Sequence, residues 1–426
     1  MRLSANLYPW DVDGDPAAAD RIAGLGLSEV TLAAAYHSVR GVTRYHPRHR
    51  IVTRDAAVYY RTDLPRWRGS PLRPRPAEPS GSFERAAAQL RTAGIKVTAW
   101  AVLTHNSLLG AANPSCAVEN AFGDSYPWAL CAGSSAVREY AAALAAEVAA
   151  LGEADAIELE ACGWYGIDHG SAHDKTAGVA GSAAGWLLSA CFCASCGQAY
   201  TAAGADPGEL RAAIRSALDQ VLTGRDAEQA APSGDPGRVP RVDPGTSRGD
   251  PAISRGDPGT ISPGGPGALP GDVGTLPDDM AGVLLAVRAA LAGRFLSEVI
   301  AAIRDAAPGK PVLVHSHPDP RAAGANPGYD PAVLLGPGGA DGIVLACWDP
   351  GTAAAHVART AAGAPPGARI AASLLAVTGL GGQPGTLIEQ AEAVRSAGAT
   401  ELRLYHAGLA APSDLAAIRR LCLAWR

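Results

Sequence analysis

The sequence predicts a (β/α)8 TIM barrel that carries a disordered Gly/Pro-rich insertion. Eight short apolar runs alternate with Ala-rich helical stretches, and such alternation forces parallel strands joined by right-handed crossovers. Nearly every apolar run ends in polar or aromatic residues, as at the face of a barrel that carries the chemistry. No Gly-rich turn follows the first run, which disfavours the alternative of an open, doubly wound sheet.

The elements follow in order from local pattern. The predicted strands are the apolar runs Leu3–Trp10, Glu29–His37, Lys96–His105, Ala156–Ala161, Pro311–His317, Gly342–Trp348, Arg369–Leu375 and Glu401–His406. The predicted helices are Asp15–Ala23, Ser82–Ala93, Ser135–Leu151, Ala183–Ala203, Ala281–Ala307, Thr352–Ala361, Gln383–Ala397 and Ser413–Ala424. Asp15 and Ser82 are good helix starts, and Gly94, Gly152 and Gly398 stand where helix C-terminal glycines belong.

Two further segments complete the predicted organisation. The alternating apolar residues of Ile51–Tyr60 predict a β-hairpin inserted after the second strand. Residues 1–223 then form the first half of the barrel with strands one to four, and residues 279–426 form the second half with strands five to eight. Residues 224–278 are the insertion between the two halves.

The insertion is predicted to be disordered. Its sequence is dominated by Gly, Pro, Asp, Arg and Ser, with a loose Asp-Pro-Gly repeat and almost no large apolar residue. Such a segment cannot bury enough surface to offset the entropy of ordering it. A folded β-repeat is the alternative, but it needs regular apolar positions, which are missing here.

Composition limits the classes of function. Hydrophobic residues make up 47% and charged residues 18% of the 426 residues, too apolar for a wholly disordered chain. The net charge of −5 disfavours nucleic acid and anionic membranes as partners, since both need clustered Lys and Arg. No apolar run reaches the roughly 18 residues that span a membrane. No secretion signal is visible, so we expect a cytoplasmic protein whose eight Cys are thiols or metal ligands.

Residues at the predicted strand ends form a candidate active site. In a TIM barrel the carboxyl ends of all eight strands meet at one face, where the active site lies. Helix capping explains some polar residues there, but not polar and aromatic groups on nearly every strand. The predicted substrate-binding residues, which include a Gly-hinged loop after the fourth strand, are Tyr8, Tyr36, His37, His105, Asn106, Trp164, Asp168, His169, His315, His317, Trp348, Tyr405 and His406.

A cluster of cysteines predicts a structural zinc site. Cys191, Cys193 and Cys196 lie within six residues, and three thiolates so spaced can wrap one soft cation. Cys131 is the preferred fourth ligand, with Cys116 and Cys162 as alternatives. Four thiolates would close the site and leave no position for water. Ordinary buried thiols are the competing interpretation, because Cys also behaves as a small hydrophobe.

One segment resembles a known family. The run from Cys131 to Tyr140, CAGSSAVREY, resembles the Cys-Pro-x-Ser-Pro-x-x-Arg-Glu-Tyr segment of zinc-containing β-galactosidase-type (clan A) glycoside hydrolases. The likeness covers residues 100–200. It implies a TIM barrel, a catalytic acid/base at Glu160 on strand four, and zinc shared between Cys131 and the later cysteine cluster. Leu159 stands where that family has Asn, and strand seven ends Ser373-Leu-Leu-Ala without the family's nucleophilic carboxylate.

The chemistry predicted at strand four is acid catalysis of glycoside cleavage. Strand alternation points both Glu158 and Glu160 into the barrel, and like charge between them raises one pKa. Arg403 on strand eight also points inward and can neutralise Glu158, which makes Glu160 the preferred general acid. Glycosidases need a second carboxylate. Asp349 is preferred over Asp168, because Trp348 beside it offers a flat face for a sugar ring.

Two alternatives stay open. The histidines predicted at the barrel mouth, with nearby carboxylates, can hold a catalytic divalent metal, as in an isomerase or lyase. The missing strand-seven carboxylate also allows a catalytically silent carbohydrate-binding barrel. In each case the expected ligand is a small molecule or oligosaccharide, and the sequence does not indicate the oligomeric state.

Overall fold

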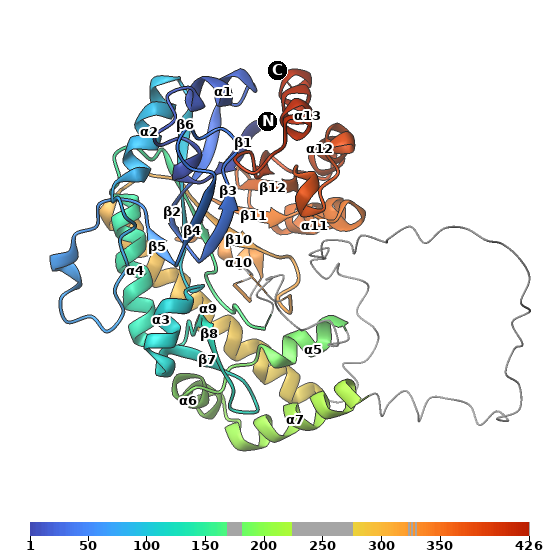
Figure 1. Ribbon diagram of the computed structural model, residues 1–426. Coiled ribbons are helices and arrows are strands. Elements are labelled where there is room, and N and C mark those ends of the chain that lie inside the picture. The colour runs from blue at the N-terminus through green and yellow to red at the C-terminus, as the bar shows by residue number, and fades with distance from the viewer. Residues whose placement is uncertain (168–180, 224–275, 323, 325–326, 329, 426) are drawn as a thin grey trace, which may run out of the picture.

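A closed barrel of eight parallel strands forms the centre of the computed structural model (Figure 1). The structure describes residues 1–167, 181–223, 276–322, 324, 327–328 and 330–425. The first strand pairs in parallel with both the second and the last, which closes the sheet. The barrel strands are β1 (Arg2–Leu7), β2 (Glu29–Tyr36), β6 (Lys96–Val102), β9 (Ala156–Glu160), β10 (Val312–Ser316), β11 (Gly342–Ala346), β12 (Arg369–Leu375) and β13 (Glu401–Tyr405). The predicted TIM-barrel fold is confirmed.

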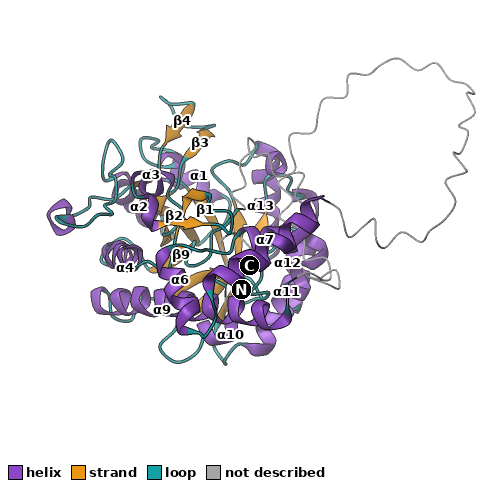
Figure 2. Cartoon of the chain, turned by 90° about the horizontal axis from the view of Figure 1, so that it is seen from below, coloured by secondary structure: helices purple, strands orange, loops and turns teal. Residues whose placement is uncertain are grey.

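Helices surround the barrel on its outer side (Figure 2). In chain order the described helices are α1 (Ala18–Gly24), α2 (Ser82–Thr92), α3 (Ser107–Ala112), α4 (Ser135–Ala149), α5 (Gly181–Leu188), α6 (Ala194–Ala202), α7 (Pro207–Thr223), α9 (Asp278–Ala306), α10 (Pro331–Leu334), α11 (Pro350–Gly363), α12 (Leu387–Ser396) and α13 (Pro412–Ala424). None of them is long and apolar enough to cross a membrane.

Burial on both faces explains the composition of the strands. Every residue of β2 is buried, and so are all but the first residues of β1 and β6. Strands covered by helices outside and by side chains inside read as continuous apolar runs rather than alternating ones. The small side chains of Ala33, Ala34 and Ala35 in β2 fit this crowding. The apolar runs were therefore a good guide to barrel strands.

The inserted hairpin differs from its prediction. Residues of β4 (Ile51–Arg54) pair antiparallel with β3 (Val39–Val42), so the hairpin spans 39–54 rather than 51–60. The rest of the predicted segment forms β5 (Ala57–Val58), which pairs antiparallel with β2. Alternation marks an extended chain but does not say which strand it pairs with. That is why the partner upstream was missed.

Other segments refine the prediction. The single helix predicted over 183–203 is two helices, α5 and α6, and the cysteine-bearing stretch lies between them and at the start of α6. The sequence did not predict α7 or the antiparallel pair β7 (Ala117–Glu119) and β8 (Ser125–Leu130). Residues 224–275 lie outside the described residues, so disorder of the insertion stays a prediction. The described chain resumes at the buried Leu276, and α9 begins at Asp278.

Candidate active site and metal centre

A fully buried ion pair lies inside the barrel below its mouth. Glu158 on β9 accepts a hydrogen bond from Arg403 Nε at 3.0 Å and lies 3.0 Å from His315 Nε2. Burial alone raises the pKa of Glu158, but the charges of Arg403 and His315 outweigh it and lower the pKa to about 2. The same carboxylate raises the pKa of His315 against the effect of burial. Glu158 is therefore a fixed negative charge, as the inward position of Arg403 predicted.

Glu160 lies two residues further along the same strand in a different setting. Its side chain is half-buried, and Trp100 Nε1 donates a hydrogen bond to Oε2 at 2.8 Å. Burial raises the pKa of Glu160, and Glu158 adds to that rise, whereas His315 and the Trp100 hydrogen bond oppose it. The net shift is upward. One strand thus carries a carboxylate held ionised and a carboxyl held toward its protonated form.

Aromatic rings from β1 and its neighbours line the mouth beside Glu160. The ring of Tyr8 stacks between His406 and Trp10, with centroid distances of 4.2 and 4.5 Å. Its hydroxyl donates to the Tyr36 hydroxyl at 3.2 Å. Tyr36 in turn packs edge-on against Trp100 at 4.8 Å. These contacts build a rigid aromatic wall, the kind of surface on which apolar faces of sugar rings stack.

A second stack continues along the rim. His37 packs face to face with Tyr36 and with His105, each at 4.2 Å between centroids. His105 then stacks on Tyr165 at 4.2 Å. Asn106, also predicted to bind substrate, instead caps α3, where its side-chain oxygen accepts the N–H of Leu109 at 3.0 Å.

Several buried polar atoms at the strand ends have no hydrogen-bond partner among the described residues. Both ring nitrogens of His406 are unpartnered, and burial lowers the pKa of this histidine to about 3, so it is neutral. Trp348, whose ring packs against Tyr405 at 5.2 Å, has an unpartnered Nε1. Asn6 Oδ1 and Ser316 Oγ are unpartnered as well. Buried polar groups without partners are costly, and neutral donors and acceptors suit hydroxyl groups of a ligand.

Some predicted site residues lie elsewhere or are occupied. Trp164 is fully buried, and its Nε1 donates to the Arg288 carbonyl on α9 at 3.3 Å. Asp349 caps α11, because Gly351 N and the Thr352 hydroxyl both donate to its carboxylate at 2.9 Å. His317 packs against His356 of α11. Asp168 and His169 lie outside the described residues.

Trp100 is a site residue that the sequence analysis missed. It lies within β6 rather than at its end, paired in register with Glu158. Alternation along β6 could have indicated it, because Thr98, Trp100 and Val102 are alternate residues that face the same side of the strand. Thr98 donates to the side chain of Glu29 inside the barrel, so that side is the inward one. An inward-facing Trp one layer below the strand ends is an expected neighbour of an inward-facing Glu.

The cysteine cluster forms as predicted. The Sγ atoms of Cys131, Cys191, Cys193 and Cys196 all lie within 4.8 Å of one another, and all four residues are buried. From Cys131, the distances to Cys196, Cys193 and Cys191 are 3.5, 3.6 and 3.7 Å. Four sulfurs at about 2.3 Å from a tetrahedral ion lie about 3.8 Å apart. The cluster can therefore hold a metal ion with little movement.

Arg288 on α9 supports this interpretation. Its side chain is fully buried, its Cζ lies 5.0 Å from the Trp164 ring centroid, and none of its three guanidinium nitrogens has a hydrogen-bond partner among the described residues. Burial lowers its pKa to about 10, while Tyr200, Cys191 and Cys196 oppose that shift. An isolated buried cation is strongly disfavoured. Four metal-bound thiolates would place negative charge beside it.

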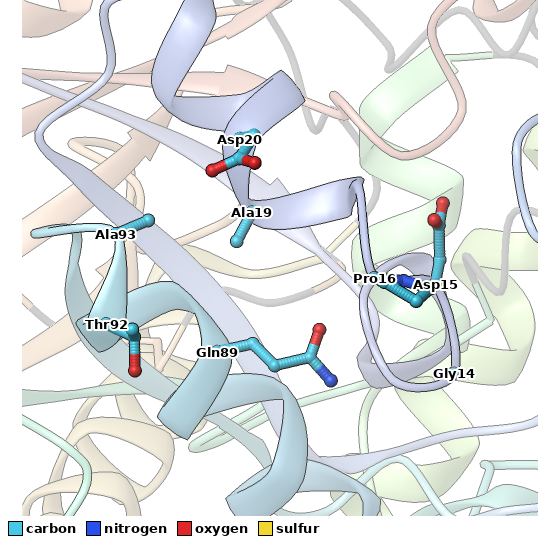
Figure 3. A pocket seen from close by; sticks show the side chains of 8 residues that line it. All are labelled: Gly14, Asp15, Pro16, Ala19, Asp20, Gln89, Thr92 and Ala93. Atoms are coloured by element: carbon cyan, nitrogen blue, oxygen red, sulfur yellow. The ribbon is translucent and has the colours of Figure 1, made fainter.

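One surface hollow lies apart from this chemistry. It has a volume of about 480 Å³ and lies between the segment leading into α1 and the helix α2, lined by Asp15, Asp20, Gln89 and Thr92 among others (Figure 3). Asp15 there is already bound by Arg21. The hollow lacks the aromatic and titratable groups that surround Glu160.

Comparisons with known proteins agree with the fold. No family model and no curated protein matches the sequence. The glycoside hydrolase domain of PgaB (BpsB) from Bordetella bronchiseptica matches with a TM-score of 0.54 and 15% identity over 99% of both chains. The catalytic domain of β-amylase from Paenibacillus polymyxa matches with a TM-score of 0.53 and 13% identity over 100% of this chain and 98% of that one.

A longer enzyme also matches. The cold-adapted β-galactosidase from Rahnella sp. R3 gives a TM-score of 0.56 at 12% identity, and the match covers all of this chain but 55% of that enzyme. This chain therefore spans about half the length of that protein. At such identities the likeness shows the fold, a TIM barrel shared with glycoside hydrolases.

Proposed function

We propose that the protein is a glycoside hydrolase in which Glu160 is the general acid. The observation that carries the proposal is the different setting of two carboxyl groups on one strand. Glu158 is bound by Arg403 and His315, whereas the half-buried Glu160 accepts a hydrogen bond from Trp100, so the pKa of Glu158 falls to about 2 while that of Glu160 rises. Pairs of titratable groups with pKa values pushed apart mark acid and base assignments in active sites. The fold shared with glycoside hydrolases supports the same reaction class.

The geometry gives each residue a role. Protonated Glu160, open to the mouth, transfers its proton to the leaving oxygen of the glycoside. Glu158 stays ionised through Arg403, and its negative charge helps to keep Glu160 protonated. Trp10, which is partly exposed and backed by the buried Tyr8 ring, supplies a stacking face for the sugar, and the neutral His406 supplies hydrogen-bonding nitrogens. This set recognises an uncharged sugar ring at the point of cleavage.

We assign only the acid in this proposal. Asp349, which the sequence favoured as second carboxylate, has both oxygens engaged at the start of α11. The alternative of a catalytic metal held by mouth histidines has no support in the described residues, where the four cysteines are the one group with metal-ligand spacing. The stacked rings of His37 and His105 serve instead as part of the rim.

We further propose that the cysteine cluster binds structural zinc. Four thiolates are a ligand set that Zn²⁺ takes in closed tetrahedral sites. Cys131 follows β8, and the other three ligands lie between α5 and α6 and within α6. Zinc would supply a covalent tie between these loops on one side of the barrel. It would take no part in the reaction, because no ligand position would remain open.

The substitution Glu160→Gln tests the acid assignment. It keeps shape and hydrogen bonding to Trp100 but removes the transferable proton, so kcat for glycosides with poor leaving groups should fall about 10²–10⁴-fold. Activated aryl glycosides, whose leaving oxygen scarcely needs a proton, should be partly spared. Glu389→Gln on α12, an exposed position, is the control. Equal losses across all leaving groups would contradict the acid role. Unchanged activity of Glu160→Gln would exclude it.

A further inference from the structure

An arginine-rich segment follows the second barrel strand. Residues 39–75 hold ten arginines and two aspartates, a formal charge of +8 in a chain whose overall charge is −5. The part closest to the barrel, residues 37–54, contains β3 and β4 and no aspartate or glutamate, and is called the arginine hairpin below. The low average charge of the chain therefore hides a local concentration of positive charge. Its arginines, all exposed except the half-buried last one, are Arg40, Arg44, Arg48, Arg50 and Arg54.

No carboxylate of the described residues forms an ion pair with the arginine hairpin. Its five arginines take part in none of the ion pairs formed by the described residues. Three carboxylates near the hairpin are bound by other arginines, Asp13 by Arg85, Asp15 by Arg21 and Asp55 by Arg75. A fourth, Asp11, lines a hollow with Arg44 but accepts the N–H of Tyr8, and burial raises its pKa to about 7. Uncompensated like charges repel one another, so the hairpin gains from an anion placed among them.

The backbone of the arginine hairpin is fixed by its own hydrogen bonds. The buried imidazole of His46 accepts the N–H groups of Arg48 and His49 through Nδ1 at 3.1 and 3.0 Å. Its other nitrogen, Nε2, then donates to the Asp13 carbonyl at 3.2 Å. Arg50 donates to the His46 carbonyl at 2.7 Å. The positive charges are thus carried on an ordered support, which lowers the entropy cost of binding an anion.

The arginine hairpin adjoins the barrel mouth. It begins directly after Tyr36, whose hydroxyl contacts Tyr8, and its first residue, His37, belongs to the rim stack. Arg44 lines a small hollow of about 40 Å³ together with Trp10, which stacks on Tyr8. Figure 2 shows β3 and β4 at the edge of the molecule, beyond β1 and β2. A polymer with one sugar at Glu160 can therefore continue onto the hairpin.

We propose that the arginine hairpin is a subsite for the acidic sugars of a polyanionic polysaccharide, carboxylated or sulfated. This inference rests on the proposed glycosidase function and names its class of substrate. Guanidinium groups bind carboxylate and sulfate oxygens through paired hydrogen bonds. The mouth itself takes an uncharged ring face, so the negative groups lie on units further along the chain. Continuity with the aromatic wall favours a glycan over other polyanions.

Binding measurements on the Glu160→Gln protein test the proposal without turnover. Three probes distinguish the ligand chemistry: polygalacturonate for carboxylate, chondroitin sulfate for sulfate, and dextran as a neutral glycan. Single-stranded DNA and phosphatidylglycerol vesicles form two further arms; the vesicles are included because Val42 and Ile51 form an exposed apolar pair beside the arginines. The variant Arg40→Gln/Arg44→Gln/Arg48→Gln removes three charges. Its matched control, Arg294→Gln/Arg419→Gln/Arg420→Gln, removes three exposed arginines from α9 and α13.

We expect one acidic polysaccharide to bind better than dextran. The hairpin variant should then bind it about ten-fold more weakly at low salt, since three exposed charge pairs are each worth about 0.5 kcal/mol, while the control changes little. Added salt should narrow the difference. Equal binding by both triple variants would overturn the proposal. Tighter, hairpin-dependent binding of DNA or vesicles would overturn it in favour of that partner. Neither result touches the leaving-group test of Glu160, so the two proposals can fail separately.

Discussion

Two fully buried arginines in this protein have opposite surroundings. Arg403, inside the barrel, lies within 3.0 Å of both Glu158 and Glu401. Arg288, on α9 behind the cysteine cluster, has no hydrogen-bond partner for its guanidinium group in the described part of the chain. The first cation is balanced by carboxylates that the chain supplies. The second cation has no such balance, because the neighbouring cysteines carry no negative charge while they are neutral thiols.

The difference separates two kinds of buried charge. The paired Arg403 inside the barrel supplies a fixed positive charge, which holds Glu158 ionised next to Glu160. The unpaired Arg288 beside four sulfurs indicates that these sulfurs carry negative charge. Metal binding provides that charge, because thiols lose their protons when they become metal ligands.

The largest expected effect is on stability, from breaking the Arg403 pair. Glu158→Gln leaves Arg403 short of a counter-charge and should lower the free energy of unfolding by about 3–5 kcal/mol at neutral pH. The pKa of Glu158 is lowered from 4.5 to about 2, so its stabilising contribution is complete above the ordinary pKa. It is lost as the pH falls from 4.5 toward 2. Denaturant unfolding at several pH values checks this.

The unfolding measurement on Glu158→Gln needs a control variant. Glu389→Gln, at an exposed position on α12, should leave stability nearly unchanged at every pH. The difference between the wild type and Glu158→Gln should shrink below pH 4.5. A constant difference from neutral pH to pH 3 would show that Glu158 acts through packing and not through its charge.

The second prediction concerns Arg288 and the metal. With zinc bound, Arg288→Met removes the cation beside the thiolates and should weaken zinc binding about 10–100-fold, as loss of outer partners does in other metal sites. In the metal-free protein the same substitution removes an unpaired buried charge and should raise stability. The sign of the stability change therefore depends on the metal.

Metal analysis and thermal melting with and without a strong chelator measure both effects. One zinc per chain is expected in the wild type, and fewer in Cys131→Ser. The exposed Arg294→Met on the same helix is the matched control. If Arg288→Met stabilises the protein equally with and without chelator, Arg288 does not serve the metal.

The smallest effect is a shift of the pH profile. Trp100 donates a hydrogen bond to Glu160, which favours the ionised form and lowers the pKa of that carboxyl. Trp100→Phe removes this donor, so the pKa of Glu160 should rise further. The general acid must be protonated, so the alkaline limb of kcat/KM should move to higher pH. A move to lower pH would mean that Trp100 does not act through Glu160.

The sequence predicted the barrel well because burial leaves a strong pattern. The eight apolar runs became the eight strands with only small changes at their ends, and the cysteine spacing placed all four sulfurs together. Parity along strand four indicated the contact between Glu158 and Arg403, since inward residues of a barrel meet in layers.

The parts that failed depend on contacts between distant segments. Trp164 was predicted to bind substrate, but the structure packs its ring against Arg288 and pairs its Nε1 with the Arg288 carbonyl. Asp349 ends a strand and also precedes a proline at a helix start, and the cap is the contact that forms. Trp100 was missed because the site residues were predicted from the strand ends, whereas Trp100 lies inside the barrel within a strand. Composition averaged over the whole chain hid the arginine hairpin.

The most direct test of the account is a measurement of the two carboxyl groups on β9. Carbon-13 NMR of protein labelled at the glutamate side-chain carboxyls, recorded as a function of pH, reports each titration separately. The resonance missing from Glu160→Gln belongs to Glu160. We predict that it titrates above the ordinary value of 4.5, while another glutamate, Glu158, stays ionised well below pH 4. A Glu160 resonance that titrates at or below 4.5 would contradict its role as the general acid.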